Sequence, residues 1–174
     1  MGPFDPQCPS NGSPMLTAMF VRYFLDLPVP FDAAEAALLE DADSWIPGLL
    51  RDAEDRGQRL LAEVGFSVDT RRIDREVEIR LGSPYRIPDK TILPMTWHAT
   101  RSERLFPQLE ADLEVAALGP HRAQISISAR YRPPMGTIGR LLDRAMLHRV
   151  AEATIKDFLD RVGERVGARQ PTTA

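Results

Sequence analysis

Three histidines, His98, His121 and His148, are the first candidates for chemistry in this chain. Histidine commonly binds metals and transfers protons near neutral pH. No two of the three are spaced as ligands of one metal, and the His-Glu-x-x-His motif of zinc enzymes is absent. The Gly-x-Ser-x-Gly turn that presents a nucleophilic serine is absent as well. We therefore assign no catalytic residue, no metal site and no cofactor from the sequence.

Amphipathic side chains remain as candidates for binding. Tyr23, Trp97 and Tyr131 fall on the inward phase of predicted strands, while Arg144 and His148 fall beside the apolar stripe of a predicted helix. Ligand pockets are mostly apolar with a few placed polar groups, so this set is typical of a site for a hydrophobic small molecule. In the alternative interpretation the aromatic residues only pack in the core, and Arg144 and His148 reach solvent along their stems.

A long C-terminal helix must position these groups. Pro133 and Pro134 end a strand because proline has no N–H for a sheet ladder, and Thr137 is the predicted N-cap. Residues 138–166 contain no proline, and apolar residues recur there at helical spacing. This stripe consists of Leu147, Ala151, Ile155, Phe158, Leu159, Val162 and Val166.

The first turns of the same helix carry a second apolar side, opposite the stripe. Its residues are Ile138, Leu142 and Met146. Loops of the same chain cover this side in the simplest interpretation. The alternatives are the mouth of a cavity or the contact surface of a homodimer.

Upstream of the helix, alternation of apolar and polar residues predicts six to seven antiparallel strands. They are expected at 18–27, around Phe66 and Val68, and at 76–81, 93–99, 108–117 and 123–131. Two short helices follow the first strand: one over 33–39 capped by Asp32, and one that ends near Glu63 after a break at 43–48. Residues 82–90 are predicted to be a proline-rich loop. The expected fold class is α+β, a curved sheet around the long helix.

Several inward positions carry alanine, which predicts free space between the sheet and the helix; the alternative is that Tyr23, Trp97 and Met146 fill it. The predicted lining residues are Tyr23, Leu25, Phe66, Val68, Val77, Ile79, Met95, Trp97, Leu109, Ala111, Leu113, Ile125, Ile127, Ala129, Tyr131, Arg144, Leu147, His148, Ala151 and Ile155.

Length and composition limit the remaining classes. The 174 residues predict one domain over 15–168, with tails at 1–14 and 169–174 and with Met1, Met15 or Met19 as the translation start. A net charge of −3 does not favour nucleic-acid binding. Cys8 is the single cysteine, which excludes an intrachain disulfide and is typical of a cytoplasmic protein. No apolar run is long enough for stable membrane insertion.

One residue and two stretches resemble a known family: Trp97, LFPQLEADLEV at 105–115, and YRPPMGTIGRLLDRAMLHRVAEATIKDFLDRV at 131–162. With these stretches, residues 18–166 resemble the START-like helix-grip (SRPBCC, polyketide cyclase-like) superfamily, in an uncharacterised bacterial branch. The resemblance implies a ligand cavity between the helix and the concave sheet, and no catalytic residue is carried over. Because this superfamily includes carriers, cyclases, hydrolases and regulators, the fold alone does not decide the function.

Three functions therefore stay open. The first is binding, carriage or sensing of a hydrophobic, lipid- or polyketide-like molecule. The second is an enzyme of the aromatase/cyclase or dehydratase type, which requires converging polar groups such as Tyr131 with His148. The third is a regulatory or oligomeric protein whose cavity is vestigial.

Overall fold

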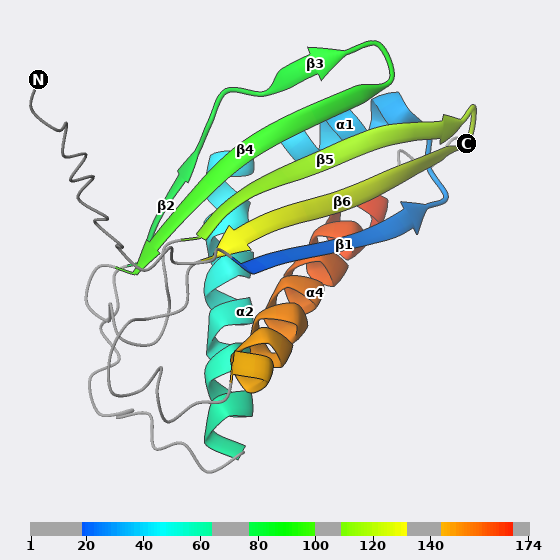
Figure 1. Ribbon diagram of the computed structural model, residues 1–174. Coiled ribbons are helices and arrows are strands. Elements are labelled where there is room, and N and C mark those ends of the chain that lie inside the picture. The colour runs from blue at the N-terminus through cyan, green and yellow to red at the C-terminus, as the bar shows by residue number, and fades with distance from the viewer. Residues whose placement is uncertain (1–18, 64–76, 100–108, 132–143, 169–174) are drawn as a thin grey trace, which may run out of the picture.

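The computed structural model describes residues 19–63, 77–99, 109–131 and 144–168. In chain order its elements are β1 (Met19–Leu27), α1 (Phe31–Leu39), α2 (Ala42–Glu63), β2 (Val77–Leu81), β3 (Tyr85–Ile87), β4 (Lys90–Ala99), β5 (Leu109–Gly119), β6 (Arg122–Tyr131) and α4 (Arg144–Ala168). The strands form one antiparallel sheet in the order β1-β6-β5-β4-β2, and β3 also pairs with β4. Helices α1, α2 and α4 lie on one face of this sheet (Figure 1). The predicted α+β helix-grip architecture is confirmed.

Side chains on the inner face, which faces the helices, form rows across the strands, because residues opposite each other on neighbouring strands share a face. At one end lies the Trp97 row, formed by Ile79, Trp97, Leu109, Tyr131 and Met19. Further along the strands lies the Leu113 row, formed by Leu93, Leu113, Ile127 and Tyr23. The inward phases predicted for these strands are therefore correct.

Helix α4 runs along β1 from the Trp97 row towards the other end of the sheet. Near its start, His148 contacts Tyr131. Further along, the Nζ atom of Lys156 lies 5.1 Å from the ring centre of Tyr23. Gly163 lies so close to β1 that a side chain there would touch the strand. The long helix is thus seated on the sheet, as predicted.

The helices after β1 differ from the prediction in two respects. Asp32 does not cap α1: the helix begins at Phe31, two residues before the predicted start, and its N-cap is Pro30. Asp32 lies in the first turn, where its negative charge interacts favourably with the helix dipole. The break predicted at 43–48 is absent, since α2 is continuous over 22 residues and includes Pro47. Burial of Trp45 and Ile46 holds this first part of α2 against the core, and packing overrides the proline there.

The proline-rich segment 82–90 is also more ordered than predicted. Residues Tyr85–Ile87 form β3, which turns back onto β4 and pairs Ile87 with Lys90. The strand predicted around Phe66 and Val68 lies outside the described residues, as does the predicted start of the long helix before Arg144.

A carboxylate links α1 to the sheet. Glu35 on α1 accepts hydrogen bonds from the Thr91 hydroxyl at 2.6 Å and from Arg86 Nε at 2.7 Å. Chiefly the Thr91 hydroxyl, and also the Arg86 guanidinium, hold the pKa of Glu35 below its ordinary value, against an opposing effect of burial. Because Thr91 is completely buried, this contact also provides a partner for its hydroxyl.

Candidate functional site

Tyr131 and His148 bring two polar groups together at the inner face. Tyr131 is the last residue of β6, and His148 lies just after the start of α4. The Tyr131 hydroxyl oxygen is 3.3 Å from Nδ1 of His148. Tyr131 is buried and His148 is half-buried, so the pair lies at the boundary between the core and solvent. The pairing that the sequence offered as an example of converging polar groups is therefore present.

Glu152 extends this pair into a chain of three groups. Its Oε1 atom is 3.2 Å from Nε2 of His148, one helical turn away. When the proton is on Nε2, His148 donates a hydrogen bond to Glu152 and accepts one from the Tyr131 hydroxyl at Nδ1. Both neighbours therefore favour the same tautomer of the imidazole. Such a chain can move a proton between a bound molecule and the surface. The sequence analysis missed Glu152, although its spacing of four residues from His148 was a usable signal.

Trp97 adds a buried hydrogen-bond donor to the same row. Only 4% of its surface is exposed, and its indole Nε1 has no hydrogen-bond partner among the residues that the structure describes. The other tryptophan of the chain, Trp45, donates its Nε1–H to the Glu40 carbonyl oxygen at 3.0 Å. The described part of the chain therefore provides an acceptor for one indole and not for the other.

Burial differs between the two halves of α4. In the Leu113 row, Leu113 itself has no exposed surface, and neither have Phe158 and Leu159 on the second half of α4. Nearer the start of α4, Met146 and Ala151 are only half-buried. The interior under the second half of α4 is therefore filled, whereas Ala151, nearer the start of the helix, packs against the core but is not completely covered.

The structure places the predicted lining residues in three groups. One group shares the inner side of the sheet or the facing side of α4: Tyr23, Leu25, Ile79, Met95, Trp97, Leu109, Ala111, Leu113, Ile125, Ile127, Ala129, Tyr131, His148, Ala151 and Ile155. In the second group, Val77 lies in β2, and Arg144 and Leu147 lie in α4. In the third, Phe66 and Val68 lie outside the described residues.

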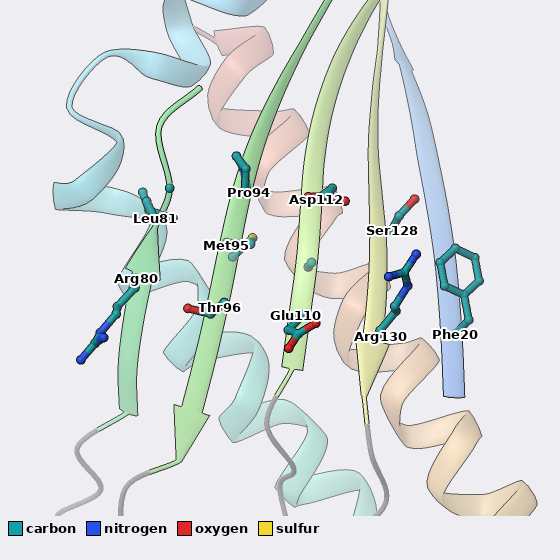
Figure 2. Close-up of a pocket in the computed structure, with 12 residues that line it drawn as sticks. Phe20, Arg80, Leu81, Pro94, Met95, Thr96, Glu110, Asp112, Ser128 and Arg130 are labelled. Carbon is teal, nitrogen blue, oxygen red and sulfur yellow. The ribbon is translucent and has the colours of Figure 1, made fainter. Parts of the chain in front are cut away.

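A hollow of about 330 Å³ lies on the opposite face of the sheet, which carries no described helix (Figure 2). Phe20 on β1 and the charged residues Arg80, Glu110, Asp112 and Arg130 line it. The sequence analysis did not predict this hollow, which depends on the register that brings side chains of separate strands together. Its mixed charge does not match the hydrophobic ligand predicted for the inner face.

Metal sites and membrane spans are both absent from the described parts of the chain. No group of three or more His, Cys, Asp or Glu residues there is arranged to hold a metal ion. No described helix combines the length and the hydropathy needed to cross a membrane. Ile138 and Leu142 of the predicted homodimer contact lie outside the described residues, and Met146 is half-buried.

Comparison with known proteins gives structural similarity only. No protein-family model and no curated protein matches the sequence. The chain is similar to the structure of a conserved protein from Geobacillus kaustophilus, with 11% identity, a TM-score of 0.49, and coverage of 86% of this chain and 96% of that one. A START superfamily protein from Mycobacterium smegmatis has 9% identity and a TM-score of 0.47, with 87% and 99% covered. The Zhui aromatase/cyclase from Streptomyces sp. R1128 has 13% identity and a TM-score of 0.46, with 90% and 98% covered.

These similar structures include the classes that the sequence resemblance named, a START protein and an aromatase/cyclase. Identities this low concern the fold and say nothing about a ligand or an activity. The element order and the sheet topology of the chain are themselves those of a helix-grip fold.

Proposed function

We propose that the protein binds a hydrophobic, lipid- or polyketide-like small molecule between α4 and the inner face of the sheet, at the end that carries the Trp97 row. The observation that carries the proposal is the Tyr131–His148 contact beside the buried apolar residues of the Trp97 row. A mostly apolar wall with a few convergent polar groups is the usual composition of a small-molecule site. Ala151, half-buried and packed against the core, lies close to His148 on the same helix.

A pair of matched substitutions on β5 tests this location. Ala111 is buried on the inner face, whereas Ala116 is half-buried on the outer phase of the same strand. We expect Ala111→Leu to lower the affinity for a fluorescent apolar probe about tenfold, or about 1.4 kcal/mol, because the added side chain occupies the proposed site. Ala116→Leu adds the same volume elsewhere and should change the affinity less than about twofold.

The measurement is a titration of 1-anilinonaphthalene-8-sulfonate followed by fluorescence, with thermal unfolding to confirm that both variants are folded. Equal probe affinity in the folded wild type and Ala111→Leu would contradict the proposed location. Native mass spectrometry of the protein purified from its own host then identifies the ligand class through a co-purifying adduct.

A second candidate function rests on the chain from Tyr131 through His148 to Glu152. A hydroxyl backed by an imidazole and a carboxylate is suited to acid–base chemistry, as in an aromatase/cyclase- or dehydratase-type enzyme. The test is the loss of water from an aryl β-hydroxyketone to give the conjugated enone, followed by absorbance. A rate that Tyr131→Phe and His148→Asn both abolish supports the enzyme. A rate that is the same in wild type and in both variants counts against it.

A further inference from the structure

The buried indole N–H of Trp97 indicates which polar group the ligand contains. Buried polar groups in proteins nearly always have a hydrogen-bond partner, and leaving one without a partner destabilises the protein. Trp97 Nε1 is such a donor, buried and without an acceptor among the described residues. A ligand that supplies an oxygen at this position removes that penalty, whereas a pure hydrocarbon does not.

The strand register puts Trp97 at the end of the sheet where we propose that the ligand binds. Trp97 and Tyr131 belong to one row and are separated by Leu109 on the strand between them. Two strand spacings correspond to about 10 Å, so both polar groups fall within the length of a small molecule. Met95, the next inward residue of β4, is buried and has an unbranched, flexible side chain that can adapt to a ligand.

We infer that the ligand is an oxygenated amphipathic molecule whose carbonyl or hydroxyl oxygen accepts a hydrogen bond from Trp97 Nε1. The polar end of the ligand then lies at the Trp97 row, beside Tyr131 and His148. This inference rests on the proposed binding function and adds to it the chemistry that the protein recognises.

Two ligands of equal chain length, 2-dodecanone and dodecane, test the binding function and the hydrogen bond from Trp97 separately. Two-dimensional ¹H–¹⁵N NMR of the wild-type protein shows one indole N–H signal for each of Trp45 and Trp97, and Trp97→Phe assigns them. We expect 2-dodecanone to shift the Trp97 indole proton downfield by several tenths of a ppm, because a hydrogen bond to an oxygen deshields it. Dodecane should bind without that shift. The Trp45 indole, already bonded to Glu40, is the internal control and should not move.

Affinity gives a second readout. Trp97→Phe keeps an aromatic ring but removes the donor, so we expect about tenfold weaker binding of 2-dodecanone and less than about twofold change for dodecane. Trp45→Phe is the matched control and should leave both affinities unchanged. If both ligands bind and the Trp97 signal moves with neither, the oxygen inference is overturned and the binding function stands. If neither ligand binds, the proposed function fails and the inference fails with it.

Discussion

Helices α2 and α4 approach each other closely at Gly57, and an alanine at this position tests how tightly they pack. A Cβ atom added to Gly57 would collide with the Oγ1 atom of Thr154 on α4 and would lie 3.7 Å from Val150 Cγ1. Thr154 is buried, and its hydroxyl donates to the Val150 carbonyl oxygen at 2.8 Å. The hydroxyl therefore has to give up this hydrogen bond, or the helices have to separate, before a methyl group fits.

Two opposing effects set the magnitude. Alanine is favoured over glycine inside a helix by about 1 kcal/mol. Forcing extra volume into a packed interface costs about 1–3 kcal/mol. We therefore expect Gly57→Ala to lower the free energy of unfolding by about 1 kcal/mol. Gly48 provides the control, because it lies in the same helix and a Cβ atom added there would meet no neighbouring atom within 4 Å. Gly48→Ala should raise the free energy of unfolding by about 1 kcal/mol.

Urea unfolding followed by far-ultraviolet circular dichroism measures both changes. The double variant Gly57→Ala/Thr154→Ala removes the obstructing hydroxyl, so the two substitutions should couple favourably by about 1–2 kcal/mol. If Gly57→Ala stabilises the protein as much as Gly48→Ala does, the close approach of the two helices is wrong. The position of α4 on the sheet would then be wrong, and so would the proposed ligand site.

Two further predictions concern the pH and the filled core. The pKa of Glu35 lies below its ordinary value of 4.5, so its ionised form stabilises the fold above that pH, and this contribution disappears as the pH falls through the lowered pKa. Thermal melts between about pH 3 and 6 should show a weaker pH dependence for Glu35→Gln, and an unchanged acid dependence would refute the role of the Thr91 contact. Phe158→Ala should lower the free energy of unfolding by about 3–5 kcal/mol because this ring is completely buried, whereas Phe24→Ala, 59% exposed on the outer face, should change it by less than about 0.5 kcal/mol; equal effects in urea unfolding would contradict this difference.

The strands were predictable because their signal is local. Alternation along β5 and β6 placed Leu113 and Ile127 on the inner face, and the structure pairs these residues across the two strands. The helix boundaries were less predictable, because the continuity of α2 through Pro47 depends on the distant core that buries Ile46. Strand β3 was missed for a similar reason. Its pairing with β4 makes it a strand, and the proline-rich segment by itself does not indicate that pairing.

The candidate site was only partly predictable. Strand phase and helical spacing brought Tyr131 and His148 to the same side of the molecule, and the structure puts them in contact. Whether the Trp97 indole finds an acceptor depends on all the residues around it in the folded protein. No local pattern in the sequence predicts that. The same holds for free space: small inward residues predict it, but Ala129 is completely buried, and its surroundings decide whether any space remains.

The two halves of α4 are expected to differ in local stability, and this follows from their different packing. Ile155 and Phe158 lie in the second half and are buried in the core, whereas Met146 and Ala151 in the first half are only half-buried. Segments with few buried apolar contacts open more easily, and binding sites are drawn from such segments. Hydrogen–deuterium exchange followed by mass spectrometry should therefore show faster exchange in residues 146–151 than in 155–162, and an apolar ligand should slow exchange mainly in the first segment. Equal protection of both segments, with or without ligand, would contradict the idea that the first half of α4 binds the ligand while the second half stabilises the core.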